Sequence, residues 1–318
     1  MPTARKELIN LDVTSYYHCY ARCVREGYLF GTGENKKNYD HRKSWVLKRI
    51  QYLSQGFAID ICAYAIMSNH YHLVFHVNKK KALAWSDDEV NARWKWALER
   101  KTDFVSSLPE EIERRRECLF SISWFMRFLN EHIARLANQE DDVKGHFWES
   151  RFKSQALVDE GALLACMTYV DLNPIRANMA NTLESSDFTS IQERLQAHHQ
   201  HQPTPPTLME FEQKEIHETK ENTIKAYLPF FIKDYLTLID WTGRHMREDK
   251  PGYIATDVPP LVFASGLNPN HWLTTVEKSS IQDQTIFGPL SKMKEWAQNI
   301  KKAWLKGQKM TRLKYSTA

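Results

Sequence analysis

The chain has 318 residues, of which 42% are hydrophobic and 26% charged; this composition is typical of a folded globular protein and excludes a disordered one. The net charge is only +4, so the total charge does not itself indicate a nucleic-acid binder, and a local basic surface would be needed. No apolar run reaches the roughly 18 residues that span a bilayer, and no signal-peptide segment is present, so we expect a cytoplasmic protein without membrane contact. The five Cys form no Cys-x-x-Cys pair, which argues against a disulfide scaffold or a cysteine zinc site.

Residues that alternate along the chain predict strands, and apolar residues at helical spacing predict helices. The expected elements in chain order are a strand (14–24), a helix (41–55), two strands (57–67 and 70–77), a helix (123–139), a strand (151–159) and a helix (161–172). Ser68 and Asn69 separate the second and third strands, which suits a tight hairpin. Pro174 is expected to stop the last helix. This order predicts an α+β fold with a ferredoxin-like split βαβ core, an antiparallel sheet with helices, plus one extra helix.

Composition divides the chain into three parts. Residues 1–195 form the predicted core domain, with a charged, helix-prone surface insertion at about 78–118. Residues 196–207 are polar and Pro-rich, which indicates a linker, and residues 208–318 are predicted to form a mainly helical C-terminal extension with a basic tail. The linker contains His198, His199 and His201; they could chelate a metal, but a solvated linker is the favoured interpretation.

A His-x-His pair occupies the third strand. His70 and His72 lie two residues apart, so both side chains point to one face of the sheet. The strand period predicts a buried face with Tyr71, Leu73, Phe75 and Val77, and an open face with His70, His72 and His76. Two imidazoles on one face can chelate a divalent cation, although a solvated polar face is the simpler alternative.

Tyr169 lies in the last predicted helix, and Asn173 follows it one turn later on the same face. A phenol has a pKa near 10 and is a poor nucleophile unless another group polarises the reaction. A metal held by two His and one amide oxygen would polarise a phosphate in this way. The alternative is that Tyr169 is simply packed in the core.

Three segments carry a resemblance to a known family. The runs YYHCYARCV (16–24), AYAIMSNHYHLVFHV (63–77) and GHFWESRFKSQALVDEGALLACMTYVDLNPIRA (145–177) resemble the HUH transposases with a single catalytic Tyr, and within them the REP-associated tyrosine transposases. The HUH motif (His-hydrophobic-His) is met by His70-Tyr71-His72, with a middle residue more polar than usual. The resemblance covers about residues 1–195, and FIKDYLTLIDWTGRHMREDKPG (231–252) is similar to an extension found in many members.

The resemblance implies a bacterial, nucleoid-associated DNA strand transferase. Such an enzyme cleaves and rejoins single-stranded DNA next to palindromic hairpins through a 5′-phosphotyrosine intermediate. It implies Tyr169 as the nucleophile, with His70, His72 and Asn173 holding Mg²⁺ or Mn²⁺. The resemblance leaves open whether the protein is a monomer or a homodimer.

DNA binding requires cations and aromatic stacking surfaces. The candidates in the core domain are Arg22, Arg25, Arg42, Lys43, Arg49, Trp148, Arg151 and Lys153. The basic C-terminal tail offers Trp296 and Trp304 as a further nonspecific contact. For each cation the alternative is a solvated surface charge, and for Trp148 it is core packing.

Two other functions were weighed. One is a domesticated protein that binds hairpin DNA without cutting it. The other is a zinc hydrolase that uses His70 and His72 with Asp60 or Asp171, which the absence of a His-Glu-x-x-His motif disfavours.

Overall fold

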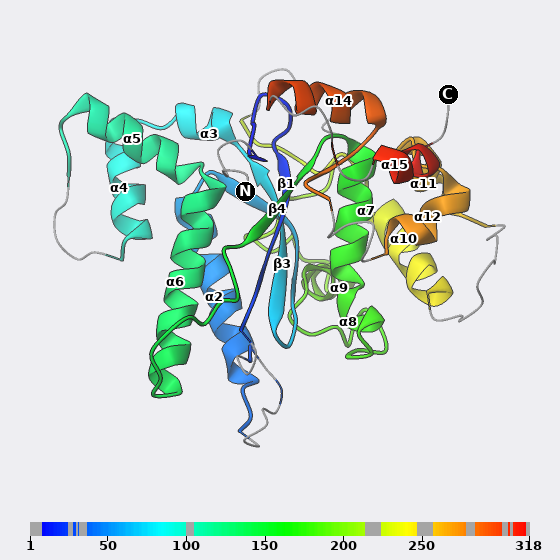
Figure 1. The fold of residues 1–318 in the computed structure, drawn as a ribbon, viewed down its shortest axis with the longest axis horizontal. Helices are drawn as coiled ribbons and strands as arrows, with labels where there is room; N and C mark the ends of the chain where they lie inside the picture. The colour runs from blue at the N-terminus through cyan, green and yellow to red at the C-terminus, as the bar shows by residue number, and fades with distance from the viewer. Residues whose placement is uncertain are drawn as a thin grey trace.

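The computed structural model describes residues 8–24, 28–29, 31, 37–99, 105–213, 224–246, 257–277, 284–300, 305 and 308–315 (Figure 1). Its strands are β1 (Tyr16–Arg22), β2 (Ile59–Ile66), β3 (His70–Val77), β4 (Lys153–Leu157) and β5 (Ile286–Phe287). Its helices are α2 (His41–Gly56), α3 (Lys79–Leu83), α4 (Asp87–Ala97), α5 (Pro109–Leu119), α6 (Ile122–Glu140), α7 (Glu160–Asp171), α8 (Asn173–Arg176), α9 (Ser190–His199), α10 (Ile232–His245), α11 (Pro260–Ala264), the 3₁₀ helix η3 (Pro269–His271), α12 (Trp272–Thr275), α14 (Leu290–Asn299) and α15 (Gln308–Lys314). Within these ranges, every helix is too short or too polar to cross a bilayer.

The strands form one sheet in the order β2-β3-β1-β4-β5. β1 runs antiparallel to both β3 and β4, and β2 runs antiparallel to β3. Ser68 and Asn69 close the β2–β3 hairpin, where the Met67 N–H donates to the His70 carbonyl at 2.8 Å. The predicted α+β fold and split βαβ core are therefore confirmed, and β5 adds a parallel strand at the edge.

Helices cover both faces of the sheet. α2 and α6 pack on one face, and α7 lies on the other (Figure 1). Tyr71, Leu73 and Phe75 face the α2–α6 side, as their alternation predicted. The expectation of an open face on the other side of β3 is wrong, because α7 covers it and His72 is completely buried.

The C-terminal region contributes to both hydrophobic cores. Tyr235 and Leu238 of α10, Trp272 of α12 and Phe287 of β5 join the core around α7. Trp296 of α14 is completely buried in the core on the α2–α6 side. The prediction that Trp296 stacks on DNA is therefore wrong, and Trp304 lies outside the described residues.

The predicted insertion forms three helices, α3, α4 and α5, which add apolar side chains to the core on the α2–α6 side. The Arg116 guanidinium donates to the carbonyls of Ala82 and Trp85, at 2.9 and 2.6 Å, and so joins α5 to α3 and to the segment after it. The first residues of the predicted linker belong to the last turn of α9, and the Met209 N–H just beyond it donates to the Ile61 carbonyl of β2.

The basic residues of α2 are largely buried, which corrects their prediction as DNA contacts. Arg42 is fully buried and pairs with Glu140 at 2.6 Å and Asp141 at 2.5 Å. Arg49 pairs with Glu99, and Lys43 lies over the Phe188 ring at 5.3 Å. Their long aliphatic stems cover the core, so the amphipathic spacing that suggested a basic surface instead reflects inward packing.

The Arg42→Gln variant is expected to lower the free energy of unfolding by about 3 kcal/mol, because it leaves two carboxylates without their buried partner. Its DNA affinity should match that of the wild type. The matched control is Arg22→Gln, since Arg22 is exposed. That control should change stability by less than about 0.5 kcal/mol and lower the slope of log affinity against log salt by about 1. Urea unfolding measures the free energy of unfolding, and the salt dependence of binding measures the DNA contact. A stable Arg42→Gln protein with weakened DNA binding would contradict the structural role given to Arg42.

Candidate active site

Two histidines meet on the α7 face of the sheet. The β1–β3 register places His18 beside His72, and His18 Nε2 lies 2.9 Å from His72 Nδ1. Both side chains are completely buried. One imidazole must donate its N–H and the other accept it, so the contact fixes the orientation of the His72 ring. His18 was missed as a site residue, although the segment YYHCYARCV and the pairing of β1 with β3 bring it there.

Burial lowers the pKa of His18 to about 4. A histidine whose pKa is lower in the folded than in the unfolded state costs stability as the pH falls from about 6.5 to 4, because the unfolded chain then binds the extra proton. We expect a loss on the order of 3 kcal/mol across this range. Urea unfolding of the wild type and of His18→Gln between pH 7 and 4 measures this loss. The free energy of unfolding of the wild type should fall by this amount more than that of the variant. An equal pH dependence in the two proteins would refute the lowered pKa of His18.

Tyr169 lies close to both histidines. Its ring centroid is 5.5 Å from that of His72 and 6.3 Å from that of His18. α7 is positioned by Asp159, whose carboxylate caps the helix by accepting the Ala162 N–H at 2.9 Å. The sequence prediction that Tyr169 and the His-x-His strand share a site therefore agrees with the geometry of the rings.

The Tyr169 side chain is only 1% exposed. Burial raises its pKa to about 12, and the Arg176 guanidinium and the Asn173 side chain act in the opposite direction. The phenol is therefore protonated at neutral pH, and a substrate can reach it only if part of its surroundings moves.

The chain does not simply stop being helical before Pro174. α7 ends at Asp171, and a short helix α8 starts at Asn173; Leu172 between them still donates its N–H to the Thr168 carbonyl at 3.0 Å. Proline is tolerated there because the first turn of a helix needs no N–H partner. The break keeps Asn173 buried next to the Tyr169 turn, where a hydrogen bond from its side chain lowers the pKa of the phenol.

His70 and His72, the residues predicted to bind a metal, lie close together on β3. Their ring centroids are 5.0 Å apart. His70 Nδ1 lies 2.8 Å from Asn69 Oδ1, and His72 Nδ1 contacts His18, so Nε2 is the atom of each ring that would bind a metal. Two imidazoles and the side-chain oxygen of Asn173 would be a donor set suited to a divalent cation with affinity for nitrogen, such as Mn²⁺.

The carboxylates proposed for a zinc hydrolase are engaged elsewhere. Asp60 lies 2.9 Å from His76 Nδ1, while Asp171 accepts hydrogen bonds from Ser190 and Tyr235. Burial raises the pKa of Asp171 to about 6. Among the described residues, no group of three or more His, Cys, Asp or Glu side chains is arranged to hold a metal, and this includes His198 and His199 at the end of α9 and His201 beyond it.

Arg176 is a second residue that the sequence analysis missed. Its guanidinium carbon lies 4.6 Å from the centroid of the Tyr169 ring. Two nitrogens of this guanidinium, Nε and Nη1, have no hydrogen-bond partner among the described residues, whereas the Gln155 side chain hydrogen-bonds to His18. Gln155 faces His18 across the β1–β4 ladder. Buried polar groups are normally paired, so these two guanidinium nitrogens remain available to a polar ligand.

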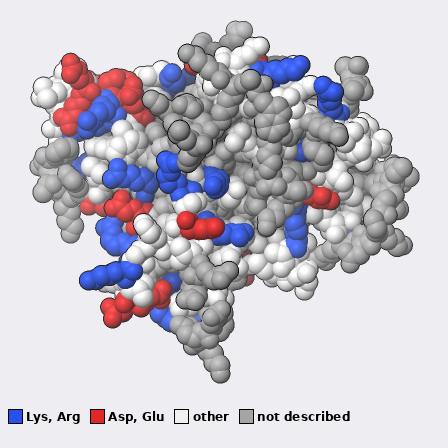
Figure 2. Space-filling view, in the orientation of Figure 1, with Lys and Arg blue, Asp and Glu red and all other residues white. Residues whose placement is uncertain are grey.

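The predicted DNA contacts fall on two sides of the sheet. Arg22 and Lys153 are exposed and share the α7 face with His70 and Tyr20, because strand alternation places them there. Arg25 lies outside the described residues. On the surface seen in Figure 2, Lys and Arg side chains of the described residues are interspersed with Asp and Glu.

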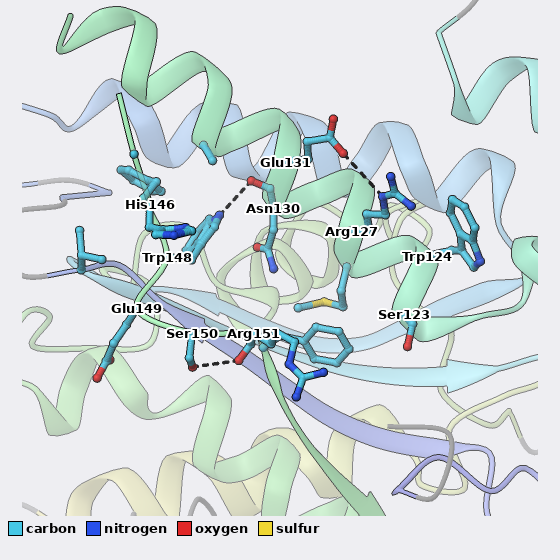
Figure 3. Close-up of a pocket in the computed structure, with 16 residues that line it drawn as sticks. Ser123, Trp124, Arg127, Asn130, Glu131, His146, Trp148, Glu149, Ser150 and Arg151 are labelled. Atoms are coloured by element: carbon cyan, nitrogen blue, oxygen red, sulfur yellow. Dashed lines mark hydrogen bonds and ion pairs between the residues drawn. The ribbon is translucent and has the colours of Figure 1, made fainter. Parts of the chain in front are cut away.

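Trp148 and Arg151 line a cleft of about 890 Å³ between α6 and the segment before β4 (Figure 3). Trp148 is half-buried; its Nε1 donates to the Asn130 carbonyl at 2.9 Å, and its ring meets Tyr71 at 5.6 Å. Trp124 lies at the other end of the cleft, with Arg127 beside it. The cleft is therefore on the α6 side of the sheet, whereas Arg22 and Lys153 lie on the α7 side. A DNA strand that contacted both sides would have to pass around the ends of β1 and β3.

Comparisons with known proteins give little further information. No family model and no curated protein matches the chain. Among solved structures, a REP-associated tyrosine transposase bound to a REP hairpin is similar to it, at 11% sequence identity and a TM-score of 0.32. The match covers 57% of this chain and 79% of that one. A likeness this remote does not assign a function, which must be argued from the residues of this chain.

Proposed function

We propose that the protein is a metal-dependent DNA strand transferase that cleaves and rejoins single-stranded DNA, next to palindromic hairpins, through Tyr169. The observation that carries the proposal is the proximity of the Tyr169 phenol to the second histidine of a His-x-His strand and to the buried side chain of Asn173 one turn further on. The sequence resemblance to the HUH transposases supports the same reaction class.

In the proposed reaction the Tyr169 oxygen attacks the phosphorus of a phosphodiester. A bond forms between this oxygen and phosphorus, the bond from phosphorus to the 3′-oxygen breaks, and the phenolic proton is balanced by protonation of the leaving oxygen. The products are a 5′-phosphotyrosine and a free 3′-hydroxyl. Attack of a 3′-hydroxyl on the phosphotyrosine reverses these changes, so the strand is rejoined without an external energy source.

His70, His72 and Asn173 would hold the Mg²⁺ or Mn²⁺ ion. A bound ion would stabilise the charge that develops on the phosphate oxygens. His18 keeps the His72 ring oriented, and the surrounding apolar core limits access of water to Tyr169. Because the set has two nitrogen ligands, we expect Mn²⁺ to support the reaction better than Mg²⁺.

The burial of Tyr169 favours a second candidate, a protein that binds hairpin DNA without cutting it. A phenol that is 1% exposed with a raised pKa is not poised for attack unless the site opens. This protein would use the exposed Arg22 and Lys153 for DNA binding and leave Tyr169 as part of the core.

Incubation with a pool of hairpin-bearing single-stranded oligonucleotides and Mn²⁺ distinguishes the two candidates. The transferase should yield a protein–DNA adduct that survives denaturation and disappears when EDTA is added first. Hairpin binding without any adduct would instead establish the second candidate. A strand cut without an adduct would contradict both.

A further inference from the structure

Arg176 ends α8 with a partly buried guanidinium beside the Tyr169 ring. Two of its three nitrogens, Nε and Nη1, have no hydrogen-bond partner. Arg176 forms no ion pair with a carboxylate in the described part of the chain. Burial lowers the pKa of its guanidinium, and the charge of Glu277 acts in the opposite direction. A partly desolvated guanidinium with unused donors is unfavourable by itself and becomes favourable when an anion binds.

The guanidinium is held in place by residues far along the chain. Its Nη2 donates to the Val276 carbonyl at 2.5 Å and lies 3.8 Å from the Met246 sulfur. Both belong to the C-terminal region, after α12 and α10. α10 itself packs closely on the α7–α8 junction, since a Cβ on Gly243 would lie 3.2 Å from Leu172 Cδ2.

The nature of the anion follows from the neighbours. Guanidinium donors match the tetrahedral oxygens of a phosphate, and the group remains charged at any working pH. The anion would sit next to the Tyr169 phenol, close to the buried side chain of Asn173. A phosphodiester is the anion whose reaction with a phenol the proposed function requires.

We propose that Arg176 binds the scissile phosphodiester beside Tyr169, and that the C-terminal region completes the active site by holding this guanidinium through the Val276 carbonyl. This inference rests on the proposed function and names a further residue of the same site. It also gives the C-terminal region a defined role in the reaction: without it, Arg176 loses its anchor.

The first test uses the free protein and inorganic phosphate. In ¹⁵N-labelled protein, the arginine Nε–H signal of Arg176 is identified by its loss in Arg176→Lys. Phosphate should shift this signal in a saturable way. The control is Arg244, an exposed arginine of α10 that pairs with Asp240 and is identified by Arg244→Lys; its signal should not move. An Arg176 signal unaffected by phosphate would overturn the inference, whatever the protein does to DNA.

The second test follows the Tyr169–DNA adduct. Arg176→Ala should lower its rate of formation by about 100-fold or more, whereas Arg244→Ala should leave it unchanged. Added guanidinium ion should restore part of the lost rate, and Arg176→Lys should retain part of it. The rate of the Ala variant should also require a higher pH, because Arg176 lowers the pKa of Tyr169. If neither guanidinium ion nor the Lys variant restored the rate of adduct formation, the role of Arg176 would be purely structural and the proposal would be rejected. If the wild type formed no adduct, the proposed function would be refuted. The phosphate titration would still decide the inference about Arg176.

Discussion

Tyr169→Phe is expected to abolish formation of the protein–DNA adduct, lowering its rate by at least about 10⁴-fold, because the phenolic oxygen is the atom that would bond to phosphorus. The ring would keep its contacts with His72 and His18, so the free energy of unfolding should change by no more than about 1.5 kcal/mol. DNA affinity should survive, since it depends on cationic contacts to the backbone. Denaturing gel analysis of labelled oligonucleotide measures the adduct, and a filter-binding assay measures affinity.

Tyr20→Phe is the matched control. Tyr20 lies on β1 with its ring 5.6 Å from that of His72, so it is a second phenol near the same histidine. Its loss should leave adduct formation within a few-fold of the wild type. If Tyr20→Phe removed the adduct and Tyr169→Phe did not, Tyr20 would be the nucleophile, and the role given to α7 would be wrong.

His72→Gln is expected to lower metal-dependent adduct formation by about 100-fold or more, because it removes an imidazole from the site that would hold the cation. The amide can still hydrogen-bond to His18, so the variant should fold. Mn²⁺ should raise the melting temperature of the wild type, since a ligand that binds only the folded state stabilises it, and should not raise that of the variant.

His76→Gln provides the comparison for this prediction. His76 lies on the same strand and the same face as His72, but its Nδ1 contacts Asp60 instead of the group around Tyr169. The His76 variant should keep both the adduct and the Mn²⁺ effect. Equal behaviour of the two variants would contradict a metal site at His70 and His72.

Local patterns predicted the parts of this structure that depend on neighbouring residues. The Ser68-Asn69 turn predicted the hairpin, and the strand period placed His70 and His72 on one face. The helical spacing placed Asn173 one turn after Tyr169, at the start of α8. These features follow from backbone geometry over a few residues.

Features set by distant contacts were not predictable in this way. A polar strand face looks the same in sequence whether it meets water or a helix, so the burial of His72 under α7 was missed. The burial of the Arg42 side chain depends on its ion pairs with Glu140 and Asp141, about 100 residues further along the chain. The place of Arg176 depends on Val276, which is equally remote. Such pairings become visible only once the sheet and its two helical layers are assembled.

Mapping the covalently bound residue tests the central claim most directly. Trypsin should release residues 154–176 as one peptide, in which Tyr169 is the only tyrosine. After reaction with oligonucleotide and Mn²⁺ and digestion of the DNA, mass spectrometry should find this peptide carrying a nucleotide phosphate on Tyr169, and the modified form should be missing when EDTA is present. A nucleotide on any other peptide, or cleaved DNA with the 154–176 peptide unmodified, would contradict the account.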